Sequence, residues 1–487
     1  MKSFRATQWG THGGYFITVD SKTPINLNRM TKAFGEAVNR HGCFRTTFHW
    51  DEEKGKLMQT IHPSVDVHNT SIVDLSDKPN AYKVAYGMSL ANSVDPKFNL
   101  NKLPLASFVI FALGSGSYAL SIAIHYIVTD EASLGIFLRD LLQLYTQGPG
   151  SLPPVQLHYS DFSDWLIRTA DRRAELRDDQ LSYWSKKLDG VQPLVLALTA
   201  PSQVKKGPRL TQIKDQIDSF ILKRYNDYVT TTSATSFAAF FAAYNVLLYK
   251  HSTQNSFVVG TAVTQHSVAQ LQEVVGFFTS VLPVRTTIED EMTFAEYLEA
   301  FHFDLTTDLS NHDLALEEAV SQTGISSRDR NYPKHLFAPD NLNMRIVNHL
   351  DVSDITTTAI VSLPNGEEKY EFLLTAHYET GEVTLRFGTR LYAEVAARRF
   401  LGAYCGLIDT LGRDPHIKIG DVSVANNDEH LQVTNFLPSS GPVNPVENKS
   451  HPLAEAWLKH TATHNQLRPF TRCGRLLATA PPCNQVR

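Results

Sequence analysis

The sequence predicts a mixed α/β protein built from two halves. Helical and strand patterns alternate along most of its 487 residues, and prolines and glycines interrupt them around residues 180–210. After this interruption the same mixture of patterns repeats. Hydrophobic residues make up 42% of the chain and charged residues 20%, which is typical of a folded globular protein with a large core.

The first half is expected to contain a β-hairpin between helices. Helical spacing of apolar residues predicts helices at residues 28–41, 132–145 and 161–187. Apolar alternation predicts strands at residues 43–48, 105–113 and 118–125. Gly42 ends the first helix, and a Gly-Ser turn joins the last two strands.

The second half repeats these patterns. Helices are predicted at residues 236–250 and 393–411, and strands at residues 256–264, 370–378 and 382–387, with a further apolar stretch at 274–284. Residues rich in Pro, Asn, His and Ser follow, and they are expected to form a linker and a poorly ordered tail. We therefore divide the chain into residues 1–180, 181–430 and 431–487.

Composition argues against several classes of protein. The net charge is -5 with basic and acidic residues well mixed, so we expect no nucleic-acid partner. The start of the chain lacks the apolar region of a secretory signal, and the most apolar stretch, residues 237–249, is too short to span a bilayer. The 4 cysteines have no CxxC spacing and the 19 histidines are scattered, which predicts no disulfide framework, no metal site and a cytoplasmic protein.

The most informative motif is the segment His125-Tyr126-Ile127-Val128-Thr129-Asp130-Glu131, between the predicted hairpin and the helix at 132–145. It resembles the HHxxxDG signature of the condensation domains of nonribosomal peptide synthetases, which join two carrier-bound acyl groups. In that signature the second histidine reacts. Tyr126 stands at its position here, and Glu131 stands at the position of the glycine.

Further segments resemble motifs of the same family in the same order. They are residues 40–48 for RHExLRTxF, 159–165 for YxDFAxW, 276–285 for GxFVNTxxxR and 311–314 for HQDxPF. The resemblance covers about residues 15–425, although the family's first strand and loop look clipped. Residues 451–457 are similar to the start of an adenylation domain, and the style of the sequence suggests a fungal origin.

The resemblance implies a two-lobed fold of the chloramphenicol-acetyltransferase-like type, a pseudo-dimer with a channel between its lobes. It also implies a role in secondary metabolism, in nonribosomal peptide or polyketide–peptide hybrid synthesis. The expected partners are acyl or peptidyl carrier proteins, whose phosphopantetheine arms enter the channel as substrates. No bound cofactor or metal is expected, and the protein is expected to be a monomer.

Position 126 decides the chemistry that the resemblance implies. An amine that attacks a thioester must lose a proton, which a neutral imidazole accepts near neutral pH. A phenol has a pKa of about 10 and is a poor base there. Tyr126 is therefore a hydrogen-bond donor to a developing oxyanion, a block in the channel, or an aromatic packed between the lobes. His125 is the alternative base, but strand alternation turns its side chain away from Tyr126 and favours a core histidine.

Four other residues complete the candidate site. Asp130 is expected to cap the following helix and, by the resemblance, to pair with Arg45 of the RTxF motif. Glu131 is either a new general base or a solvated acid favoured by the helix dipole. Ser280 stands where the family has an asparagine and keeps some capacity for hydrogen bonding.

Three functional hypotheses remain open. The protein is a condensation domain with impaired catalysis, a non-catalytic docking scaffold or decayed synthetase fragment, or an acyl or aminoacyl transferase that acts in trans. The third would need a site rewired around His125, Tyr126 and Glu131. The altered motifs favour impaired or absent catalysis, whereas the intact apolar patterns indicate that the fold itself is maintained.

Overall fold

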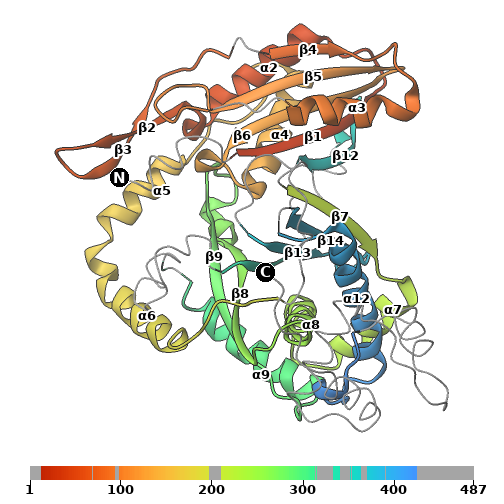
Figure 1. The fold of residues 1–487 in the computed structure, drawn as a ribbon. Coiled ribbons are helices and arrows are strands. Elements are labelled where there is room, and N and C mark those ends of the chain that lie inside the picture. The colour runs from red at the N-terminus through yellow and green to blue at the C-terminus, as the bar shows by residue number, and fades with distance from the viewer. Residues whose placement is uncertain are drawn as a thin grey trace, which may run out of the picture.

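The computed structural model describes ten segments of the chain. They are residues 12–67, 70–93, 98–196, 210–312, 314, 333–339, 351–352, 354–363, 370–389 and 391–424. Two six-stranded sheets, each with its own helices, form two lobes that lie one above the other (Figure 1). The predicted two-lobed α/β architecture is therefore confirmed. The predicted tail at 431–487 lies outside the described residues.

The upper lobe in Figure 1, here called the N lobe, is built on a sheet with β1 near its middle. Its strands are, in spatial order, β11 (Asp351–Val352), β12 (Ile355–Leu363), β1 (His12–Ser21), β6 (Ser117–His125), β5 (Ala106–Gly114) and β4 (Thr70–Asp74). The pair of β4 with β5 is parallel, and the other described pairs of this sheet are antiparallel.

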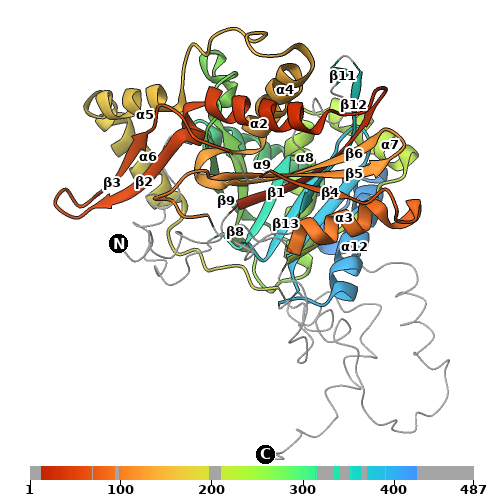
Figure 2. The ribbon, with the colours of Figure 1, turned by 90° about the horizontal axis from the view of Figure 1, so that it is seen from above.

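Helices cover both faces of the N-lobe sheet. Figure 2 shows α2 (Leu27–Arg40) and α4 (Glu131–Gln147) on one side of it and α3 (Asn80–Ser93) on the other. Side chains of β1 alternate accordingly, so that Tyr15 and Ile17 join the core under α2 and α4 while Phe16 joins the smaller core under α3. The predicted hairpin and the helices at 28–41 and 132–145 are confirmed within two residues.

Two predictions about the first half need correction. Residues 43–48 do not form one strand, because Gly42–Arg45 make a 3-10 turn before β2 (Thr46–Asp51), which pairs with β3 (Lys56–Ile61) in a separate hairpin. The helical region at 161–187 is two helices, α5 (Tyr159–Arg168) and α6 (Ala174–Lys187), because the chain bends at Thr169 and Ala170.

The lower lobe in Figure 1, here called the C lobe, packs its helices against one face of a second sheet. Its strands are, in spatial order, β7 (Leu210–Gln216), β14 (Glu382–Gly388), β13 (Phe372–Ala376), β10 (His335–Pro339), β8 (Ser256–Thr264) and β9 (Thr279–Thr287). Its helices are α7 (Ser219–Thr230), α8 (Ser236–Lys250), α9 (Phe294–Leu309) and α12 (Glu394–Arg413). Within the described part of the chain, no helix is long and apolar enough to cross a membrane.

Candidate functional site between the lobes

His125 is a buried histidine at the end of β6. It is 3% exposed, and its Nδ1 accepts a hydrogen bond of 3.1 Å from the backbone N–H of Ile127. This contact starts the short 3-10 turn over Tyr126–Val128, and the ring of Phe98 packs edge-on against the imidazole. The imidazole therefore sits in the N-lobe interior with Nδ1 occupied, as expected for a core histidine.

Tyr126 differs sharply from its neighbour in exposure. Its side chain is 41% exposed although the residues on both sides of the turn are buried. The position that the family signature assigns to the reacting histidine is therefore accessible, and it carries a phenol.

Asp130 joins the two lobes. It caps α4 as predicted, since Oδ1 accepts a hydrogen bond of 2.9 Å from the backbone N–H of Ser133. Its Oδ2 accepts from the backbone N–H of Phe278 at 3.0 Å and from the Thr279 hydroxyl at 3.1 Å, both in the C lobe. The carboxylate is 4% exposed. Asp130 therefore holds the start of α4 against the start of β9.

The predicted pair of Asp130 with Arg45 is wrong. Arg45 ends the 3-10 turn after α2, and its Nε donates to the carbonyl of Asn39 at 2.9 Å. Its Nη1 donates to the carbonyls of His62 and Pro63. The guanidinium is thus used to fasten the end of α2 to the chain after β3, while C-lobe donors satisfy Asp130.

Ser133 and Tyr159 strengthen the same junction. The Ser133 hydroxyl donates to the carbonyl of Gly276 at 2.7 Å and accepts from its N–H at 3.0 Å, and the Tyr159 hydroxyl donates to the carbonyl of Phe277 at 2.8 Å. A Cβ on Gly276 would lie 2.0 Å from Cδ2 of Tyr159, so only glycine fits there. We call Asp130, Ser133, Tyr159 and residues 276–279 the lobe clamp.

Ser280 lies one residue beyond the lobe clamp. It is half-buried in β9, where it pairs with Val263 of β8. Its hydroxyl has no hydrogen-bond partner among the described residues, and its neighbour Thr279 makes the contact to Asp130 instead. The sequence thus indicated the right segment but the wrong hydroxyl.

A second imidazole, which was not predicted from the sequence, approaches Asp130 from the C lobe. Nε2 of His266 lies 3.7 Å from Oδ1 of Asp130, and the ring packs edge-on against Phe278. His266 is 8% exposed, and this burial lowers its pKa although the charge of Asp130 opposes the shift. The side chain is therefore neutral near neutral pH. No local signal identifies it, because it lies in a short turn after β8.

Tyr15 and Arg386 also reach this site and were not predicted. Burial raises the pKa of the Tyr15 hydroxyl well above its usual value, and the nearby Tyr126 and Glu131 raise it further, while Arg386 opposes them. Tyr15 belongs to β1 of the N lobe and Arg386 to β14 of the C lobe, so charges from both lobes act on this hydroxyl. Glu131 is half-buried in the first turn of α4. The predicted site residues Tyr126 and Glu131 therefore both lie near the Tyr15 hydroxyl, which was not predicted.

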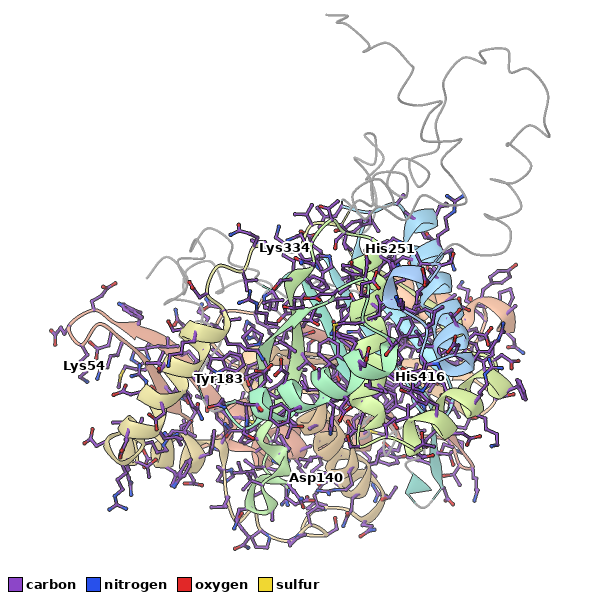
Figure 3. The ribbon with its side chains drawn as sticks, turned by 90° about the horizontal axis from the view of Figure 1, so that it is seen from below. Lys54, Asp140, Tyr183, His251, Lys334 and His416 are labelled. Atoms are coloured by element: carbon purple, nitrogen blue, oxygen red, sulfur yellow. The ribbon has the colours of Figure 1, made fainter. Side chains whose placement is uncertain are left out.

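The Arg40-His41 part of the predicted family motif is structural. Arg40 Nε lies 2.8 Å and His41 Nε2 3.1 Å from Oδ2 of Asp140, a buried carboxylate of α4 labelled in Figure 3. Arg139 contacts the same carboxylate and also Glu273 of the C lobe, at 2.6 Å. This network fixes α2 against α4 and adds a second contact between the lobes.

The site offers hydrogen-bond donors and a neutral imidazole. Within the residues that the structure describes, no group of three or more His, Cys, Asp or Glu side chains is placed to hold a metal ion. Chemistry in this site would rest on the Tyr15 and Tyr126 hydroxyls, the Glu131 carboxylate and the neutral His266 imidazole.

Comparisons with known proteins agree with this architecture. The sequence profile described as "Condensation domain" matches residues 14–434. The chain is 25% identical over 424 residues to bacitracin synthase 3 of Bacillus licheniformis, covering 83% of this chain and 6% of that protein. It is 24% identical over 418 residues to gramicidin S synthase 2 of Aneurinibacillus migulanus, covering 84% of this chain and 9% of that protein. The chain thus spans only a small part of these relatives.

Solved structures show the same two-lobed fold. The condensation domain of the monacolin K polyketide synthase MokA superposes with a TM-score of 0.69 at 17% identity, covering 84% of this chain and 93% of that one. The X-domain of teicoplanin biosynthesis superposes with a TM-score of 0.72 at 20% identity, covering 86% and 94%. Fold and site together define a two-lobed protein of the chloramphenicol-acetyltransferase-like class. The chain belongs to the condensation domain family.

Proposed function

We propose that this protein is a condensation domain of nonribosomal peptide or polyketide–peptide hybrid biosynthesis whose amide-forming chemistry is impaired. One observation carries the proposal. An exposed phenol, Tyr126, stands where the family signature has its reacting histidine, and the adjacent His125 is buried with Nδ1 occupied. A phenol with a pKa near 10 does not accept the proton of an attacking amine at neutral pH.

The substrates in this proposal are two thioesters on the phosphopantetheine arms of acyl or peptidyl carrier proteins. The amine on one carrier attacks the thioester carbonyl on the other. An amide bond forms, the C–S bond of the attacked thioester breaks, and the carrier that held it leaves as a free thiol, while the product stays on the carrier that brought the amine. Tyr126 retains the ability to donate a hydrogen bond to the oxyanion of this step, but it does not take the proton. Asp130 acts only as a positioning residue, because the lobe clamp uses both its oxygens.

The test uses the full chain with acyl-loaded and aminoacyl-loaded carriers, and mass spectrometry of the carrier-bound products. We expect little or no product from the wild type and more product from Tyr126→His, which restores an imidazole at the accessible position. Tyr126→Phe is the control, because it changes the same position without adding a base. Wild-type product as abundant as that of Tyr126→His would contradict impaired catalysis.

A non-catalytic docking scaffold is the second candidate. It is favoured by one observation on a protein of the same fold, since the X-domain of teicoplanin biosynthesis is known in a complex with OxyB. If this chain is a scaffold, carriers bind to it without any product from the wild type or from Tyr126→His. Product from Tyr126→His would instead favour a working channel with one disabling residue. Product from the wild type that depends on Glu131 would favour a rewired transferase acting in trans.

A further inference from the structure

The C lobe contains a cavity of about 390 Å³ between α6, β9 and α9. Its lining comes from the last residues of α6, the last residues of β9 and one side of α9. β9 begins at Thr279 in the lobe clamp, and Arg285 in the cavity lies about 20 Å further along the same strand. Figure 1 shows α6 and α9 in the lower part of the C lobe, away from the N lobe. The cavity is therefore separate from the site between the lobes.

Arg285 has donors that remain available to this cavity. Its Nε donates to the Ser256 hydroxyl at 3.1 Å, and its Nη1 donates to the carbonyls of Lys187 and Asp189 at 3.0 Å each. Among the residues that the structure describes, Nη2 has no hydrogen-bond partner and the guanidinium has no carboxylate partner. Arginine is charged at every physiological pH. The existing bonds thus fix the guanidinium beside the end of α6 and leave the two N–H groups of Nη2 for a ligand.

Two lysines at the end of α6 differ in their pairing. Nζ of Lys187 lies 3.3 Å from Oδ2 of Asp304 and 3.3 Å from Oδ1 of Asp308, both on α9. Lys186 is exposed and has no ion pair with any described residue. Two carboxylates therefore hold Lys187, whereas Lys186 and Arg285 have none. Three cations and two carboxylates leave one excess positive charge at the cavity, which suits a monoanion.

α9 supplies the apolar part of the lining. Tyr297, Ala300 and Phe301 face the cavity from two successive turns of this helix. The rings of Tyr297 and Phe301 stack with their centroids 5.7 Å apart, and the Tyr297 hydroxyl is already bonded to the Thr286 hydroxyl at 2.5 Å. The lining is thus segregated, with unpaired cations on α6 and β9 and aromatic surface on α9.

We propose that this cavity binds a small aromatic carboxylate, whose acid group contacts Arg285 and Lys186 and whose ring packs on Tyr297 and Phe301. Hydrogen bonds between a guanidinium and a carboxylate are charge-assisted and therefore strong. Aromatic rings add stacking to the apolar area that they bury. A cavity of about 390 Å³ lies within the usual range of small-molecule sites, about 300–1,000 Å³. Inorganic phosphate has no apolar part to contact α9, so the lining favours the aromatic acid.

The test measures binding of phenylacetate to the full chain by ligand-observed NMR, with phenylacetamide, acetate and inorganic phosphate as comparison probes. We expect a Kd of about 1 mM for phenylacetate, which has few atoms. Phenylacetamide, which lacks the charge, should bind about tenfold more weakly. Acetate, which lacks the ring, should also bind about tenfold more weakly.

Three variants test the residues of this cavity. Lys186→Gln should weaken the binding of phenylacetate about threefold, because this charge is exposed. Arg285→Gln should abolish the preference for the acid over the amide, but it also removes the bonds to the end of α6. Ala300→Trp leaves those bonds in place, and its larger side chain should fill the cavity and weaken the binding of phenylacetate about tenfold.

Lys22→Gln and Ala85→Trp are the matched controls, because both residues are exposed in the N lobe. They should leave the binding of phenylacetate unchanged, and melting temperatures should show that the variants are folded. Equal binding of phenylacetate and phenylacetamide by the wild type, or no binding of either, would overturn the site. Phenylacetate binding that Ala300→Trp leaves unchanged would also overturn it. Tighter binding of phosphate than of phenylacetate would overturn the aromatic carboxylate as its ligand. None of these outcomes bears on the proposed function, which concerns the site between the lobes.

Discussion

Oδ2 of Asp130 lies 3.0 Å from the backbone nitrogen of Phe278, and this hydrogen bond crosses from the N lobe to the C lobe. The residue that the signature motif places near the chemistry is therefore part of the connection between the lobes. Its carboxylate is buried, and both oxygens accept hydrogen bonds. Replacing Asp130 should therefore lower the stability of the protein, whatever it does to activity.

Asp130→Ala should lower the free energy of unfolding by about 3 kcal/mol, because it removes a helix cap and leaves buried donors of Phe278 and Thr279 without an acceptor. The measurement is denaturant unfolding. The control is Asp218→Ala, which removes the exposed cap of α7 alone and should cost about 1 kcal/mol. Equal costs for the two variants would mean that the contacts across the lobes add nothing.

Gly276→Ala should disrupt the lobe clamp, because its methyl group would lie 2.0 Å from the Tyr159 ring. We expect a loss of about 2 kcal/mol in unfolding free energy as α5 moves away. Gly402→Ala in α12 is the control, since a Cβ there meets nothing within 4 Å. Alanine in this helix should stabilise the protein by about 0.5 kcal/mol. The two substitutions should therefore change the free energy of unfolding in opposite directions.

Asp140→Asn should cost about 3 kcal/mol at neutral pH, because Arg40 and His41 lose a buried carboxylate partner. Although burial opposes it, the contacts with His41 and Arg139 hold the pKa of Asp140 below its ordinary value. A lowered carboxyl pKa contributes stability above the ordinary pKa of about 4, and this contribution disappears as the pH falls through the folded-state value. The difference between wild type and variant should therefore shrink in acid. Asp164→Asn, which breaks an exposed pair with Arg168, should change stability by less than about 0.5 kcal/mol.

His335 should make the C lobe sensitive to mild acid. The side chain is completely buried in β10, and burial lowers its pKa to about 4. Between that value and the ordinary pKa of about 6.5 the unfolded chain binds a proton that the folded one does not, so stability falls as the pH falls through this window. From about pH 7 to about pH 4 the loss should be about 3 kcal/mol, and His335→Leu should remove it. The exposed His49→Leu is the control, and an unchanged pH dependence in His335→Leu would contradict the assignment.

Local patterns predicted the elements of this fold well where burial is strong and regular. The helix at 236–250 and the strand at 256–264 match their predicted bounds, because nearly every residue of that helix is buried and the strand runs through the sheet interior. β1 was missed because both its faces are buried, so Tyr15, Phe16 and Ile17 show no alternation. Periodicity says nothing about partners, which is why β12 could not be assigned to the N-lobe sheet.

Only the site residues that belong to a sequence motif could be predicted. Its residues 125–131 do lie at the junction, and Asp130 does cap α4. The partner of Asp130 was wrong because a buried carboxylate bonds to the donors that the folded chain brings nearest, and these come from the far side of the lobe boundary. His266, Tyr15 and Arg386 carry no motif of their own, and only tertiary structure brings them to the site.

The location of β12 also governs when the protein can fold. β12 pairs along β1 from Gly14 with Leu363 to Ser21 with Ile355. The N lobe therefore needs a strand from residues 355–363, which are synthesised long after the rest of its sheet. Until then β1 presents an unpaired edge that invites association with other chains. A fragment cut at the apparent boundary near residue 180 would keep that edge permanently. The N lobe is therefore complete only when the whole chain has been made, and truncations intended to isolate it should aggregate.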